Sequence, residues 1–144
     1  MEIKDKSTKE LETLSQEIRD RIIDVVSRKG GHFSSTLGAV ELTLGMHYVF
    51  DACSDPFIFD VSHQCYPHKL LTGRWEEFET VRQFGGLSGF TKPNESPADY
   101  FVAGHSSTSI SLAVGAAKAI ALKKENRVPV VMIGDGSMTA GMVY

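Results

Sequence analysis

The feature that most constrains the fold is an apolar run near the end of the chain, from Val128 to Ile133, followed directly by Gly134-Asp135-Gly136. A short, continuous apolar run is typical of a strand that is buried on both faces of a parallel sheet. The aromatic and β-branched segment Pro56 to Val61 predicts a second strand, and Tyr100 to Val102 a short third one.

Helical patterns alternate with these strands. The segment from Ser7 to Lys29 predicts a helix, because Ser7 and Glu10 form a capping-box pattern and glycines follow Lys29. A second, largely apolar helix is expected from Thr36 to Phe50, and a third from Ser106 to Glu125. Shorter helical pieces, a loop and a final return to helix are expected at 67–73, 75–83, 85–97 and from 138 onward. The alternation predicts an α/β domain with a parallel sheet flanked by helices.

The strand end at Asp135 is the strongest candidate for chemistry. Ligands of open parallel sheets bind beyond the carboxyl ends of the strands. A carboxylate placed there can coordinate a hard cation such as Mg²⁺. The glycines on either side let the backbone approach a diphosphate closely, and a following helix would add N–H groups. The alternative is an ordinary turn, which the tripeptide alone does not exclude.

Histidines and hydroxyls mark other candidate positions. His32, His63 and His105 each follow a predicted helix or strand end, where functional side chains concentrate. If they converge, their imidazoles could bind an anion or transfer protons. Ser106, Ser107 and Thr108 after His105 are also natural N-caps, which would explain them without any ligand. The two remaining histidines, in the second helix and in the 67–73 piece, are expected to be structural.

Composition narrows the class of protein. The 144 residues suit one domain, and 42% hydrophobic with 23% charged residues is ordinary for a globular fold. A net charge of −3 without a basic stripe gives no sign of nucleic-acid binding. No secretory signal or bilayer-spanning segment is recognised, so no membrane association is expected. Two irregularly placed cysteines, Cys53 and Cys65, indicate free thiols and a cytoplasmic location.

Five stretches in this order resemble 1-deoxy-D-xylulose-5-phosphate synthases, which are thiamine diphosphate enzymes of the transketolase superfamily. The resemblance covers nearly everything from Leu14 to Tyr144. The stretches are "GGHFSSTLGAVELTLGMHYVF", "DVSHQCYPHKLLTGR", "RQFGGLSGF", "GHSSTSISLAVGAA" and "IGDGSMTAGM". Transketolases proper carry a different sequence, rich in glycine and proline, where this chain has "GHSSTS". The resemblance implies the thiamine diphosphate-binding fold.

The resemblance also implies residue roles. His32 would face the reacting carbon and move protons, and His63 would contact the cofactor near its diphosphate. The implied reaction condenses pyruvate with D-glyceraldehyde 3-phosphate, releases CO₂ and supplies isoprenoid and thiamine synthesis. The implied metal would offset diphosphate charge that an acidic domain could not otherwise hold. The other implied positions are Asp135 for Mg²⁺, Gly136 and Ser137 for the diphosphate, and Gly104, His105 and Ser106 for the thiamine site.

The chain departs from the family pattern at a few positions and at its end. Ser62 stands where many relatives have glycine, and Cys65 and Ser137 where alanine is frequent. The asparagine expected as second metal ligand, the glutamate that activates thiamine and the arginines for substrate phosphate lie beyond Tyr144. The expectation is therefore that 1–144 is the N-terminal portion of the diphosphate-binding domain of a longer, multidomain, homodimeric enzyme.

That expectation has several consequences, and two other interpretations compete with it. Alone, the 144 residues should be inactive and bind the cofactor weakly. The sheet should be incomplete, because two or three strands are fewer than the usual number, about four to six. The edge of the strand at 128–133 would then invite association. The rival interpretations are a transketolase and a non-catalytic, standalone binding module.

Overall fold

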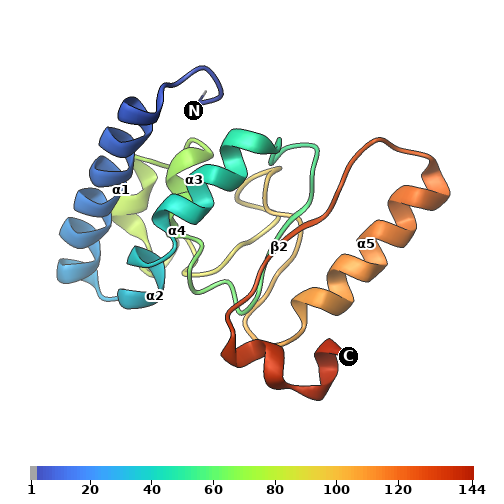
Figure 1. Cartoon of the computed structure of the whole chain (residues 1–144). Coiled ribbons are helices and arrows are strands. Elements are labelled where there is room, and N and C mark those ends of the chain that lie inside the picture. The colour runs from blue at the N-terminus through green and yellow to red at the C-terminus, as the bar shows by residue number, and fades with distance from the viewer. Residues whose placement is uncertain (1–2) are drawn as a thin grey trace. The chain divides into compact units, whose positions relative to one another are not determined.

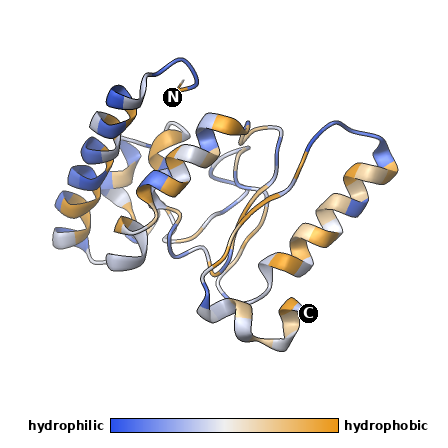
Figure 2. Ribbon diagram, in the orientation of Figure 1, coloured by the Kyte–Doolittle hydropathy of each residue, from blue (hydrophilic) through white to orange (hydrophobic). Residues whose placement is uncertain are grey.

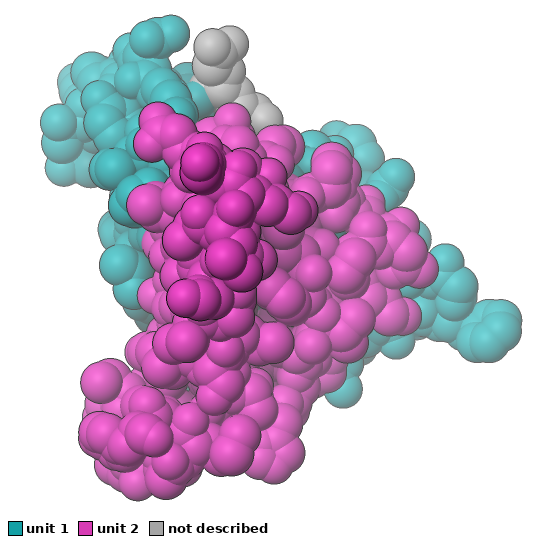
Figure 3. Space-filling model, turned by 90° about the vertical axis from the view of Figure 1, so that its right-hand side faces the viewer, with its two compact units in different colours: residues 1–50, 63–89 teal, residues 51–62, 90–144 magenta. Residues whose placement is uncertain are grey.

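The computed structural model describes residues 3–144, and the chain divides into two compact units. Figure 3 colours the two units separately. Among the described residues, unit 1 combines 3–50 with 63–89, and unit 2 combines 51–62 with 90–144. The candidate residues are therefore divided as well: His32 and His63 belong to unit 1, and the positions from 104 to 137 belong to unit 2.

Helix α1 of unit 1 spans Thr8–Lys29, as the sequence predicts. The Ser7 side chain accepts the Glu10 N–H and the Glu10 carboxylate accepts the Ser7 N–H, so the capping box is complete. Figure 2 shows alternating polar and apolar residues along this helix. Its buried positions follow the three- and four-residue spacing of one helical face. They are Leu14, Ser15, Ile18, Ile22, Val25 and Val26.

The predicted second helix is in fact two helices, α2 (Ser34–Leu37) and α3 (Val40–Val49). Gly38 and Ala39 separate the two helices, and only the glycine disfavours a helix intrinsically. A tertiary contact fixes this turn: the buried Thr36 hydroxyl donates to the His63 carbonyl over 3.0 Å. The prediction of one continuous helix was therefore wrong at its start.

Two short pieces complete unit 1, α4 (Tyr66–Leu71) and the 3₁₀ helix η1 (Glu77–Thr80), close to the predicted positions. Helix α4 packs against α1 and α3 and is buried at every position. His47 of α3 and His68 of α4 share a hydrogen bond of 2.9 Å between their rings. Their expected structural role is confirmed, since this bond joins two packed helices.

Unit 2 contains the parallel sheet. Strand β1 (Phe57–Phe59) pairs with β2 (Val130–Met132) in the register Phe57↔Val130. Helix α5 (Ser109–Lys123) contacts both strands, and the turns η2 (Gly136–Thr139) and η3 (Gly141–Val143) follow β2 near the start of α5 (Figure 1). The predicted α/β class, with a small parallel sheet, is confirmed.

Three details of unit 2 differ from the expectations. Within residues 3–144 β1 is the partner strand of β2, and the Val130 and Val131 positions are only half-buried. Residues 100–102 form no strand. The Phe101 carbonyl accepts a hydrogen bond from the Thr91 hydroxyl at 2.9 Å instead of one from a neighbouring strand. Helix α5 begins at Ser109 rather than at Ser106. Neither Cys53, which is exposed, nor Cys65, which is buried in unit 1, forms a disulfide among residues 3–144.

The part of the chain from residue 3 to 144 has no helix that is both long and apolar enough to cross a bilayer.

Candidate active site

The position of His32 is fixed by the residue before it and by a buried tyrosine. The Tyr66 hydroxyl oxygen accepts the backbone N–H of His32 over 3.3 Å. Gly31 has a φ of +152°, and a Cβ atom there would lie 2.8 Å from the same hydroxyl. Tyr66 cannot retreat easily, because it is fully buried and its ring packs edge-on against Phe78. Glycine before the histidine is therefore a steric requirement of this turn.

His63 lies beside His32 in unit 1. The two imidazole rings are 5.8 Å apart between centroids and nearly perpendicular. Thr36 holds the His63 backbone through its carbonyl. Within residues 3–144 the buried Nδ1 atom of His63 has no hydrogen-bond partner. A buried polar nitrogen in that state is unfavourable by about 1–3 kcal/mol, so it is suited to receive a ligand group.

His32 is held toward its neutral form. Burial lowers the pKa of the His32 imidazole, and electrostatic interactions with Arg82 and His63 lower it further. A hydrogen bond to the Gly89 backbone acts in the opposite direction without reversing the shift. A neutral imidazole carries one donor and one acceptor nitrogen, so His32 can take up or release a proton near neutral pH.

In unit 2 the loop before α5 presents Gly104, His105 and Ser106 to solvent. The His105 Nδ1 atom lies 2.8 Å from the Ser106 carbonyl oxygen, which can only accept. Nδ1 therefore carries the hydrogen, and in the neutral ring Nε2 is left as the acceptor. The space where a Cβ of Gly104 would point is empty to 4 Å. The loop thus offers exposed polar atoms next to accessible backbone.

The strand end after β2 lies against this loop. The Ser107 hydroxyl donates to the Ser137 carbonyl over 2.8 Å, which joins the two segments. Asp135 is exposed, and Cβ atoms built on Gly134 and Gly136 would meet nothing within 4 Å. Asp135 can supply one oxygen ligand to a cation. No cluster of three or more metal-binding side chains occurs in residues 3–144.

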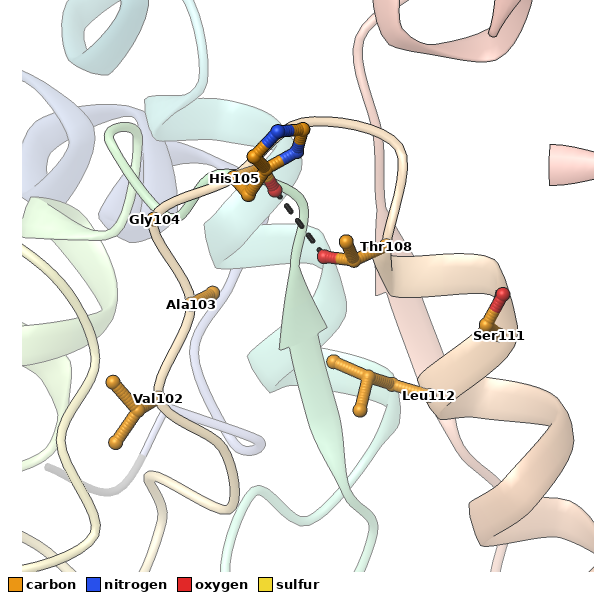
Figure 4. A pocket seen from close by; sticks show the side chains of 7 residues that line it. All are labelled: Val102, Ala103, Gly104, His105, Thr108, Ser111 and Leu112. Atoms are coloured by element: carbon orange, nitrogen blue, oxygen red, sulfur yellow. Dashed lines mark hydrogen bonds between the residues drawn. The ribbon is translucent and has the colours of Figure 1, made fainter. Parts of the chain in front are cut away.

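A pocket of about 450 Å³ lies between this loop and the first turns of α5 (Figure 4). Val102, Ala103 and Leu112 give it apolar walls, while polar groups line its upper end in Figure 4. The Thr108 hydroxyl points to the His105 carbonyl and donates to it over 3.2 Å. Unit 2 therefore combines a partly apolar pocket with a polar loop, an arrangement typical of small-molecule sites.

Comparison with known proteins identifies the family. A family model described as 1-deoxy-D-xylulose-5-phosphate synthase matches residues 1–144. The chain belongs to the 1-deoxy-D-xylulose-5-phosphate synthase family. Proteins of that name are similar to it in Aliarcobacter butzleri (89% identical), Nitratiruptor sp. (75%) and Campylobacter hominis (70%). Each similarity covers 100% of this chain and 24% of the relative, so the chain spans about a quarter of their length.

In this member of the synthase family, the predicted site residues fall into two groups, one in each unit. The structure brings His32 and His63 together in unit 1, and in unit 2 it bonds Ser107, next to 104–106, to Ser137. Three supporting residues were missed from the sequence: Tyr66 accepts the His32 N–H, Arg82 lowers the His32 pKa, and Asp60 accepts the Ser107 N–H. Only Asp60 carried a signal that could have revealed it, because it follows a buried strand just as Asp135 does. Tyr66 and Arg82 act on His32 through the tertiary structure, which no local sequence pattern predicts.

Proposed function

We propose that this chain is part of an enzyme that condenses pyruvate with D-glyceraldehyde 3-phosphate to 1-deoxy-D-xylulose 5-phosphate and releases CO₂. The enzyme would use thiamine diphosphate and Mg²⁺. The single observation that carries the proposal is the family match, which extends over residues 1–144 and includes every candidate site residue.

The residues of unit 2 fit the diphosphate and its metal. Asp135 is an exposed carboxylate, and Gly136 leaves open space beside it, so a charged, bulky group could approach the backbone. Ser137 would add its own N–H there. His105 and Ser106 would line the thiamine end, with His105 Nε2 as acceptor.

The residues of unit 1 fit a role in proton movement. When bound, thiamine diphosphate would supply the carbanion chemistry, and the protein would supply orientation and proton transfer. His32 would take up or return a proton at the reacting carbon, which its depressed pKa permits at neutral pH. His63 would offer its partnerless Nδ1 to the cofactor near the diphosphate.

The proposal includes further properties of the whole protein. Residues 1–144 would be the N-terminal portion of the diphosphate-binding domain of a longer, homodimeric, cytoplasmic enzyme. Its partners would be small-molecule substrates rather than nucleic acid or membrane. No contact among residues 3–144 favours transketolase or a non-catalytic module over this assignment.

The test is a product assay on the full-length protein. Incubation with ¹³C-labelled pyruvate, D-glyceraldehyde 3-phosphate, thiamine diphosphate and Mg²⁺ should yield labelled 1-deoxy-D-xylulose 5-phosphate and CO₂ by NMR. Omission of the cofactor, or the substitution Asp135→Ala, should abolish it. Product formed from a ketose phosphate donor but not from pyruvate would instead identify a transketolase. Absence of turnover with either donor would leave the binding module and overturn the enzyme assignment.

A further inference from the structure

Asp60 is a buried carboxylate at the end of β1 that makes the cap of α5 from outside the helix. It is 1% exposed. Its oxygens accept hydrogen bonds from the Ser107 N–H at 2.9 Å, the Ser109 N–H at 3.2 Å and the Ser109 hydroxyl at 2.7 Å. The formal N-cap residue, Thr108, makes no side-chain cap bond of its own. Asp60 therefore caps the start of α5, a role that the side chain of the N-cap residue usually has.

These bonds reach the loop that carries His105 and Ser106. Ser107 adopts a φ of +70°, a strained conformation that residues other than glycine seldom adopt. Such backbone persists only where its surroundings impose it. Two contacts do so here: Asp60 accepts the Ser107 N–H, and the Ser107 hydroxyl donates to the Ser137 carbonyl at 2.8 Å. One carboxylate thus fixes a loop that is bonded to the Gly134–Ser137 corner.

The charge of Asp60 is stabilised in place. Burial by itself raises the pKa of the Asp60 carboxyl, but hydrogen bonds from Ser107, Ser109 and Ser137 outweigh burial and hold the pKa below its usual value. The group is therefore ionised at neutral pH and acts only as an acceptor. An amide in its place would present NH₂ toward a backbone N–H, so at least one buried donor would lose its partner.

We propose that Asp60 is a positioning residue for the cofactor site of unit 2. It holds the segments 104–106 and 135–137 in the arrangement that binds the ligand, and it does so without touching the ligand. This inference rests on the proposed function, because the segments are assigned to cofactor binding there. Loss of Asp60 is expected to weaken cofactor binding much more than it slows the chemical step.

The experiment compares wild type with Asp60→Asn in the full-length protein. The KM for thiamine diphosphate at fixed Mg²⁺ should rise by about tenfold or more, which corresponds to losing one charge-assisted hydrogen bond from the preorganised loop. The kcat at saturating cofactor should stay within about threefold, since Asp60 contacts no reacting atom. Hydrogen exchange should become faster at the Ser107 and Ser109 amides in the protein without cofactor.

Asp99→Asn is the matched control. Asp99 is also a buried carboxylate of unit 2, 2% exposed, and it accepts a backbone N–H, that of Lys92, at 2.8 Å. It is bonded to neither cofactor segment in that contact. Its substitution should lower thermal stability while leaving the KM for thiamine diphosphate and the exchange at Ser107 and Ser109 as in wild type.

The outcomes test the positioning role of Asp60 separately from the proposed function. An active wild type whose Asp60→Asn variant keeps the KM for thiamine diphosphate, or loses kcat alone, overturns the inference. A rise in that KM equal in the Asp99→Asn control would also overturn it. If Asp60→Asn does not fold, Ser109→Ala removes only the 2.7 Å hydroxyl bond and should give a smaller rise in KM. A wild type without thiamine diphosphate-dependent product refutes the proposed function, while the exchange experiment still tests the anchoring of the loop.

Discussion

The Ser62 hydroxyl accepts the backbone N–H of Thr91 over 2.8 Å and lies 3.0 Å from the Thr91 hydroxyl, to which it donates. Ser62 has a φ of +74°, and its neighbour Val61 has a φ of +59°. Positive φ is uncommon for serine and a true outlier for a β-branched residue. The buried bonds to Thr91 therefore offset backbone strain at the residue before His63.

This relationship predicts an unusual order of stability at position 62. Ser62→Ala keeps the strain and leaves the Thr91 N–H without its partner, so it should destabilise by about 1–3 kcal/mol. Ser62→Gly loses the same bonds but relieves the strain, so it should be about 1 kcal/mol more stable than the alanine variant. Urea unfolding of both variants measures the difference. An alanine variant more stable than the glycine variant would contradict the account.

A pair of glycine substitutions should have opposite effects. Gly31→Ala places a Cβ 2.8 Å from the Tyr66 hydroxyl in a backbone region that suits glycine, so it should destabilise by about 1–3 kcal/mol and displace His32. Gly45→Ala, inside α3, adds a Cβ that meets nothing within 4 Å. It should stabilise by about 0.5–1 kcal/mol through helix propensity. Thermal unfolding distinguishes them, and equal effects would contradict this steric assignment.

Glu41 should contribute stability that is lost in acid. Arg19 pairs with it through both terminal guanidinium nitrogens, and Ser15 donates to it at 2.9 Å. These contacts lower the pKa of Glu41 from 4.5 to about 2. A carboxyl with a depressed folded-state pKa stabilises fully above its unfolded value and loses that effect as pH falls from 4.5 toward 2. Because Glu41 is exposed, the amount should be only about 0.5–1 kcal/mol.

The measurement is the pH dependence of unfolding in wild type and Glu41→Gln. The substitution removes the titrating group but keeps an acceptor for Arg19. The two proteins should differ above pH 4.5 and converge toward pH 2. A constant difference across that range would show that the pair does not titrate as described.

The activity of the full-length protein should depend on His32 being neutral. Its pKa lies below the usual 6.5, so the acid limb of the kcat–pH profile should fall below pH 6.5. Arg82 contributes to this shift through its positive charge. Arg82→Met should therefore raise the His32 pKa and move the acid limb to higher pH. Lys9→Met, which removes an exposed cation from α1, should leave the profile unchanged.

Movement of the limb in the opposite direction, or the same movement in both variants, would contradict the assignment of His32. A uniform loss of rate at all pH values would point to a role of Arg82 in binding rather than in the titration of His32.

Local patterns in the sequence determined the elements whose signals lie close together along the chain. Ser7 and Glu10 start α1 within a single turn, and the apolar runs at 56–61 and 128–133 contain both strands. Candidate site residues could also be proposed from the sequence, because Asp135 and His63 stand where parallel sheets and turns present side chains. The family resemblance, carried by motifs in order, is confirmed by the match over residues 1–144.

Only the tertiary structure decided where α5 begins, where the second helix breaks and which groups hold the site. Local chemistry favoured Ser106 or its neighbours as the N-cap. Instead Asp60 caps this segment by accepting the Ser107 N–H, although Asp60 lies 47 positions earlier in the chain. Thr36 likewise turns the chain through the carbonyl of His63, and Tyr66 places His32. The physical reason is common to all three. A buried hydrogen bond between distant residues outweighs propensities worth a few tenths of a kcal/mol to about 1 kcal/mol, and no local pattern encodes its partner.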